Sequence, residues 1–151
     1  MKIFARIIVC VAALLLISAC AALALPARSF ERAEVFATCS GRLEALAVHD
    51  RAYREDNSPE IGVLSSTFTD LLHAVLPDAH EEGVPANQHT LWRVAGWSEV
   101  AALLNEVYFT FDAARSMRAA NALRERIMQC TELILPKEEP DWVNRVSGLT
   151  H

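Results

Sequence analysis

Apolar residues recur at spacings of three and four along most of the chain after residue 28, as in helices with one buried face. The pattern predicts four helices, over residues 29–55, 59–76, 89–109 and 112–135. The apolar face of the first consists of Phe36, Cys39, Leu43, Leu46 or Ala47, and Tyr53. Ser29 can cap its first turn, because a serine hydroxyl accepts a hydrogen bond from a free backbone N–H.

The second predicted helix has an apolar face made of Ile61, Leu64, Phe68, Leu71, Leu72 and Val75. Asn57 and Glu60 form a capping pattern at its start, and Pro59 suits a first turn. We expect Pro77 to end this helix, because proline lacks the N–H that a continuing helix needs. A polar loop is therefore expected over residues 78–88.

The third and fourth predicted helices are expected to be separate. The apolar face of the third consists of Val94, Trp97, Ala101, Leu104 and Tyr108. That of the fourth consists of Met117, Ala120, Leu123, Ile127, Cys130 and Ile134, and Asp112 is expected to cap its start. Without a break at 110–112 the two would form one helix of roughly 45 residues, about 70 Å long. Such a helix would be much longer than the helices it packs against.

Strand signals are absent, since alternation of polar and apolar residues never lasts and no Asn-Gly or Asp-Gly turn occurs. Four amphipathic helices with short connections predict an all-α, up-down-up-down four-helix bundle. The bundle domain is expected over residues 25–135. The tail over 136–151 is polar except for Trp142 and Val143.

The first 24 residues have the organisation of an export signal. Lys2 and Arg6 precede an unbroken apolar run over residues 7–16, and small residues follow it. Residues 1–24 are therefore expected to be a signal peptide. The remaining chain of about 127 residues is the size of one domain.

Three outcomes are open at the end of this signal. A signal peptidase could cleave after Ala24 or after Ala27, next to small residues. The stretch 17–20 (ISAC) could instead be a lipobox, in which Cys20 is acylated. Residues 7–25 are also charge-free and just long enough to span a bilayer if no cleavage occurs.

The charge of the chain argues against two classes of partner. The full sequence has a net charge of −5, from 14 Lys and Arg against 19 Asp and Glu. Without Lys2 and Arg6 the balance is 12 against 19, a net charge of −7. Nucleic acids need a basic face, and anionic lipids need a polybasic patch, so neither is an expected partner. Membrane attachment is expected only if Cys20 is lipidated or the signal stays uncleaved.

The cysteines point to a cross-link. The chain has four, at Cys10, Cys20, Cys39 and Cys130. Either kind of cleavage leaves Cys39 and Cys130 as the available pair in an oxidising compartment, where a disulfide is the usual outcome. In an antiparallel pairing of the first and last helices the two lie at similar heights. The alternative is a pair of free buried thiols.

No motif for a cofactor, a metal or catalysis is present. The Cys-x-x-Cys-His pattern of covalent haem is missing, and so are Gly-x-Ser-x-Gly and glycine-rich phosphate loops. His73, His80 and His89 bracket one predicted loop together with Glu81, and convergence there would be needed for a metal site. His49 lies beside Asp50, but neighbours on a helix are not expected to point the same way. We expect no cofactor and no catalytic or metal-binding residues.

Two groups of side chains could form a surface for a partner. Trp97 fits the apolar stripe of the third helix, whereas Trp92 does not and would be exposed or covered by the tail. Arg115, Arg118 and Arg126 are expected on a solvated face, with ion pairs to the acidic first helix.

The run Cys39-Ser40-Gly41-Arg42 is the most distinctive after the signal. It suggests that Gly41 allows close approach of a neighbouring helix and that Arg42 forms a salt bridge. With Cys130, the run resembles a loose set of small exported bacterial helical proteins, which have a Cys-x-Gly-Arg start and a second cysteine near the end of the last helix. The resemblance implies an exported helical fold and no particular activity.

These observations predict a non-catalytic, exported cell-envelope protein, periplasmic or secreted, with an interaction or accessory role through one helix face. The identity of a protein partner does not follow from the sequence. The alternative is a periplasmic helical bundle that binds a small ligand or a metal.

Overall fold

Four helices make up most of the part of the chain that the computed structural model describes, which is residues 25–53 and 59–134. They are α2 (Ser29–Tyr53), α3 (Pro59–Glu81), α4 (Gln88–Phe109) and α5 (Ala113–Thr131). The expected signal peptide, the Asn57 cap and the polar tail lie outside the described residues. None of the described helices has both the length and the apolar composition needed to cross a membrane.

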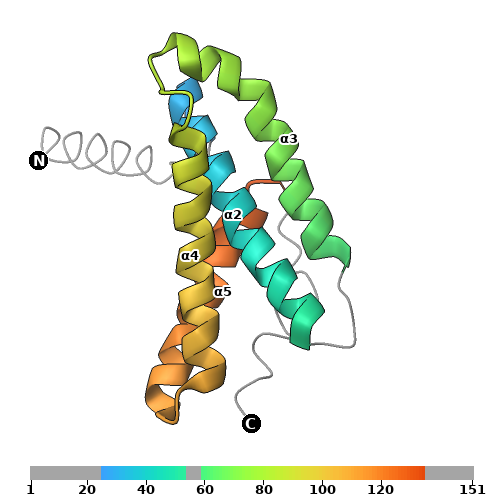
Figure 1. Ribbon diagram of the computed structural model, residues 1–151, viewed down its shortest axis with the longest axis vertical. Helices are drawn as coiled ribbons and strands as arrows, with labels where there is room; N and C mark the ends of the chain where they lie inside the picture. The colour runs from blue at the N-terminus through green and yellow to red at the C-terminus, as the bar shows by residue number, and fades with distance from the viewer. Residues whose placement is uncertain (1–24, 54–58, 135–151) are drawn as a thin grey trace, which may run out of the picture.

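The four helices form an all-α, up-down-up-down bundle in which α2 is central, and the predicted fold class is confirmed (Figure 1). Helices α3 and α4 both pack along α2, while α5 packs mainly on α4. Three successive α2 residues, Cys39, Ser40 and Gly41, are all buried. Successive positions point in directions about 100° apart, so α2 is enclosed from several sides.

The start of α2 is capped from outside the helix. The backbone N–H groups of Ser29 and Phe30 donate to the carboxylate of Glu82, over 3.2 and 3.1 Å. The expected Ser29 cap is not observed, because the Ser29 hydroxyl accepts a hydrogen bond from Arg32 instead. These hydrogen bonds from Phe30 and Ser29 lower the pKa of the Glu82 carboxyl.

Helix α3 does not end at Pro77, as the sequence predicts, but continues to Glu81. Pro77 removes one backbone hydrogen bond, and the last turns of α3 lean over the start of α2 (Figure 1). Gly83 lies two residues after the end of the helix, and its φ of 96° is the left-handed conformation that glycine favours. The N–H groups of Gly83 and Val84 bond back to His80 and Ala79, so a two-bond cap ends α3.

The break before the last helix is confirmed, and so is its cap. The Asp112 carboxylate accepts hydrogen bonds from the N–H groups of Ala114 and Arg115, over 2.9 and 3.1 Å. Helix α5 ends at Thr131, a few residues before the predicted end at 135.

Most of the predicted apolar positions of α2, α3 and α5 are buried. The core includes Phe36, Leu43, Ile61, Phe68, Leu72, Leu123 and Ile127. In these three helices two predicted core residues are exposed, namely Tyr53, the last residue of α2, and Met117, in the second turn of α5.

Candidate interaction face on α4

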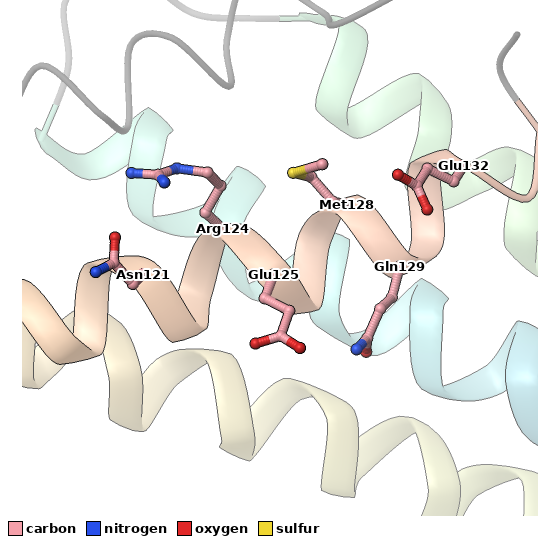
Figure 2. Close-up of a pocket in the computed structure, with 6 residues that line it drawn as sticks. All are labelled: Asn121, Arg124, Glu125, Met128, Gln129 and Glu132. Carbon is pink, nitrogen blue, oxygen red and sulfur yellow. The ribbon is translucent and has the colours of Figure 1, made fainter. Parts of the chain in front are cut away.

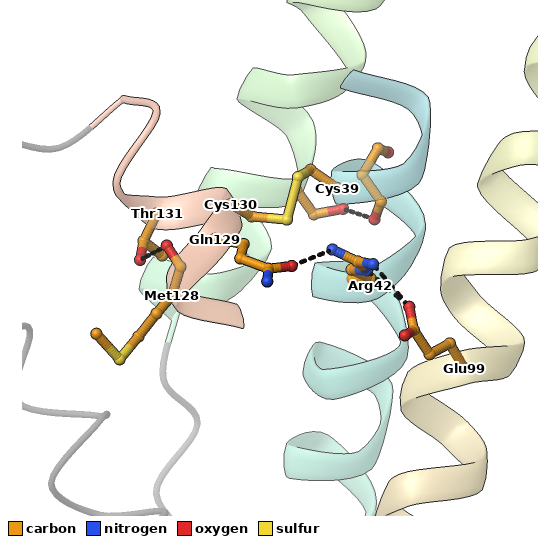
Figure 3. Close-up of a disulfide and its surroundings, with 9 residues drawn as sticks. Cys39, Arg42, Glu99, Met128, Gln129, Cys130 and Thr131 are labelled. Atoms are coloured by element: carbon orange, nitrogen blue, oxygen red, sulfur yellow. Dashed lines mark hydrogen bonds and ion pairs between the residues drawn. A yellow bond between two sulfur atoms is a disulfide. The ribbon is translucent and has the colours of Figure 1, made fainter. Parts of the chain in front are cut away.

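One turn of α2 joins the other three helices. Cys39 forms a disulfide with Cys130 of α5, as predicted, with a Cα–Cα distance of 5.5 Å (Figure 3). The hydroxyl of Ser40 lies 2.8 Å from that of Thr69 on α3. Gly41, the next residue, contacts α4. The distinctive run from Cys39 is therefore a structural junction.

Helices α2 and α4 meet at two glycines. A Cβ atom on Gly41 would overlap the carbonyl oxygen of Arg93 and lie 2.9 Å from its carbonyl carbon. A Cβ atom on Gly96 would overlap the carbonyl oxygen of Thr38 and lie 3.1 Å from the carbonyl carbon. Each backbone thus occupies the space that a side chain would need. The close approach expected at Gly41 is confirmed, and α4 is the helix that makes it.

Arg42 completes the junction by an ion pair. Its guanidinium bonds to the Glu99 carboxylate of α4 over 2.8 and 2.9 Å and reaches Gln129 of α5 at 3.4 Å (Figure 3). Arg126 of α5 binds the second oxygen of Glu99. Glu99 therefore links α2, α4 and α5. Arg115 and Arg126 pair with α4, and the predicted pairing with the first helix is wrong for these two.

The Glu99 carboxyl is held in its charged form. Burial by itself would raise its pKa, but hydrogen bonds from Arg126 and Arg42 outweigh burial, so the pKa lies below its ordinary value. A carboxyl with a lowered pKa stabilises the fold above its unfolded pKa. That stabilisation is lost as the pH falls through the folded pKa.

Glu99→Gln is therefore expected to lower the melting temperature near neutral pH, with a difference from wild type that shrinks below about pH 4. Thermal unfolding followed by circular dichroism between neutral and acid pH measures this. Glu34→Gln, at an exposed carboxyl of α2, is the matched control and should follow wild type throughout. A Glu99→Gln curve parallel to wild type at every pH would contradict the assignment.

The charged side chains of α4 all turn toward the protein's own helices. Its three residues of the Asp, Glu, Arg and Lys types are Arg93, Glu99 and Glu106. Arg93 pairs with Glu44 of α2 at 2.8 Å, and Glu106 pairs with Arg115 of α5 at 2.6 Å. All three therefore lie on the inner side of α4 or along its flanks. The opposite side carries no charged residue.

That opposite side is uncharged, mostly apolar and exposed over the whole length of the helix. We define the outer face of α4 as Leu91, Val94, Ala95, Ser98, Ala102, Asn105 and Phe109, all of which are exposed. Their spacing places them on the side away from Gly96 and Val100, which are buried. Leu91 and Val94 are each 55% exposed, and Phe109 is 62% exposed. Trp97 and Tyr108 border the face at 41% and 38% exposed.

The predicted stripe of α4 is thus largely wrong. Of its members only Leu104 is buried, whereas Val94, Trp97 and Tyr108 are exposed. Trp92, expected to be exposed or covered by the tail, packs partly buried against the core. The helix is apolar on both sides, so periodicity alone does not decide which side faces inward. Two signals in the sequence could have decided it, namely the position of Gly96 and the placement of the three charges.

An open pocket of about 350 Å³ lies on α5. Its described lining comes from α5 and the residue after it, and consists of Asn121, Arg124, Glu125, Met128, Gln129 and Glu132. Arg124 and Met128 extend from one side of the helix, and Glu125 and Gln129 from the other (Figure 2). The Nε atom of Arg124 is buried and has no hydrogen-bond partner in the described part of the chain. Five of these six residues have polar or charged side chains, with both signs of charge present.

The histidines do not build a metal centre among the described residues. No group of three or more His, Cys, Asp or Glu side chains in residues 25–53 and 59–134 is arranged to hold a metal ion. His73 and His80 are exposed on α3, and His89 lies in the first turn of α4. These three residues are therefore not brought together as a site.

His49 takes part in an aromatic cluster between α2 and α4. Its ring centre lies 4.9 Å from that of Tyr53 and 4.5 Å from that of Tyr108. Its Nδ1 atom is 3.5 Å from the carboxylate of Asp50, so the two neighbours do face each other, contrary to the prediction. The cluster packs the end of α2 against α4 beside the outer face.

Comparison of the chain with protein-family models, curated proteins and solved structures finds no match. The site is therefore interpreted from its own geometry.

Proposed function

We propose that the protein is an exported component of the cell envelope with a non-catalytic interaction or accessory role, exercised through the outer face of α4. The observation that carries this is an exposed apolar helix face without charge, on a helix whose charged residues are all paired within the chain. Exposed apolar surface of this extent is typical of sites that bind another protein. The Trp97, Tyr108 and Phe109 rings supply the aromatic groups that dominate binding at such sites.

Export is supported by two features. The Cys39–Cys130 disulfide is compatible with an oxidising periplasmic or extracellular location, since such bonds are rare in the reducing cytosol. The basic and apolar pattern over residues 1–24 supports a signal peptide. The proposed site of action is the periplasm or the exterior, with membrane attachment if Cys20 carries lipid.

A second candidate function is the binding of a small polar ligand on α5. The pocket beside Arg124 favours it, because its buried guanidinium nitrogen has no partner among residues 25–53 and 59–134 and can donate to an anionic or carbonyl oxygen. Arg124→Gln would abolish binding of such a ligand, while Val94→Glu on the outer face of α4 would not affect it. No observation among the described residues favours a metal.

Photo-crosslinking in intact cells tests the first proposal. A photoreactive amino acid replaces Leu91 on the outer face of α4, or Val63 on α3, which is 61% exposed and serves as the matched control. The expected result is a discrete covalent adduct from position 91 and none from position 63. Adducts of equal yield at both positions, or none at 91, would refute a binding role for this face.

The intact mass of the protein from the same cells, measured without reductant, tests export. A mass that begins at Leu25 shows cleavage after Ala24, and a mass from Cys20 with acyl chains shows a lipoprotein. The precursor mass with a disulfide shows an uncleaved anchor. Free thiols at Cys39 and Cys130 would contradict export to an oxidising compartment.

A further inference from the structure

We infer that the outer face of α4 binds the same face of a second copy of this chain, with the two α4 helices antiparallel. This inference rests on the proposed function and names its partner. It draws on the charge of the face, the order of its side chains and its area.

The charge of the chain makes this face more suitable for self-association than a charged part of the surface would be. The chain has a net charge of −5, so two copies repel each other over most orientations. The outer face of α4 carries no charged side chain, and the nearest charges, Arg93, Glu99 and Glu106, are already paired within the chain. Contact through this face therefore brings no unpaired like charges together. A strongly charged partner or a lipid headgroup would find no ionic contact there.

Apart from Val94, the side chains of the outer face are ordered symmetrically about position 100. Val94 would lie opposite Glu106, which is already paired with Arg115. Large side chains stand at both ends, at Leu91 and Phe109, and smaller ones lie between them. In an antiparallel pair centred at position 100, Leu91 faces Phe109 and Ala95 faces Asn105 of the other copy. Ser98 then faces Ala102, so the two backbones can approach closely at the centre. The helix dipoles of antiparallel neighbours also attract each other.

The area suits a weak dimer. Full burial of an aromatic side chain covers about 150–250 Å². The exposed fractions of Leu91, Val94 and Phe109 on the face, and of Trp97 and Tyr108 at its border, add up to roughly 500 Å² per copy. A stable interface buries about 800 Å² per partner, so we expect a pair that dissociates on dilution.

Sedimentation equilibrium of the protein without residues 1–24 tests the dimer between about 1 µM and about 1 mM, a range that covers weak dimers. Wild type should shift from one to two copies as its concentration rises. Val94→Glu should remain a monomer, because the dimer would bury an unpaired charge. Val63→Glu places the same charge on α3 at similar exposure and should dimerise as wild type does. Circular dichroism should show both variants folded.

A monomeric wild type at the highest concentration would overturn the inference, and so would a dimer that Val94→Glu leaves intact. The proposed function is judged separately, by photo-crosslinking at position 91. An adduct to a different protein there, with a monomeric chain in solution, would support the proposed function and refute the second copy.

The antiparallel register has its own test. Chains with Ala95→Cys and chains with Asn105→Cys are oxidised separately and as a mixture. The mixture should form a covalent dimer much faster than either variant alone. Faster cross-linking of Ala95→Cys with itself would overturn the antiparallel arrangement in favour of a parallel one.

Discussion

Replacement of both Cys39 and Cys130 by serine is expected to lower the free energy of unfolding by about 2–4 kcal/mol in the absence of reductant. The bond closes a loop with a sequence separation of 91, and loops of this size lose the most chain entropy when cross-linked. Helices α2 and α5 share little other contact, so the disulfide is their main connection. Helical content should stay the same, because α5 still packs on α4.

Urea unfolding followed by circular dichroism measures this effect, with and without a reducing agent. Reductant should bring the wild type to the stability of the double variant and leave the double variant itself unchanged. Cys130→Ser alone should behave similarly, apart from the free Cys39 thiol. If the unfolding midpoint is the same for wild type, for wild type with reductant and for the double variant, the disulfide does not stabilise the fold.

Gly41→Ala is expected to lower the free energy of unfolding by about 2 kcal/mol or more, although alanine is the better helix former. The added methyl group would overlap the Arg93 carbonyl and press on the backbone of Trp97. Backbone atoms cannot turn aside as a long side chain can, so α2 and α4 would have to separate. That separation would also disturb the Arg42–Glu99 ion pair one residue away.

Gly62→Ala provides a control of opposite sign. Gly62 lies in α3, and a Cβ atom there would meet nothing within 4 Å. This substitution should raise the free energy of unfolding by about 0.5–1 kcal/mol, the gain in helix propensity alone. Gly96→Ala should resemble Gly41→Ala. Equal effects at Gly41 and Gly62 would contradict the close crossing of α2 and α4.

The helices, the break before Asp112 and the disulfide could be predicted because local spacing and compartment chemistry determine them. The extension of α3 past Pro77 could not, because the cap at Gly83 and contact with α2 outweigh one missing hydrogen bond. Periodicity predicts the wrong inner side for α4, because apolar residues occupy both sides of that helix. Gly96 and the charged residues of α4 indicate the inner side, whereas the apolar spacing does not.

The candidate interaction face could not be predicted from the sequence, because no motif marks it. Arg42 and Gly41 are distinctive in the sequence, yet their contacts are internal and hold the bundle together. The candidate face consists of residues such as Leu91 and Phe109, which form no recognisable motif. The exposed fractions of these side chains and the pairing of the α4 charges with neighbouring helices show that the described residues leave this side of α4 uncovered.

The capping of α2 by Glu82 has a consequence for the order of events during synthesis. The first turn of α2 is closed by a side chain that lies 53 residues later in the chain. A chain made from its N-terminus therefore cannot complete this turn until the whole of α3 and its final corner have emerged. The start of the bundle therefore closes late, although it is made first, and a chain that stops before residue 82 would leave the first N–H groups of α2 without this partner.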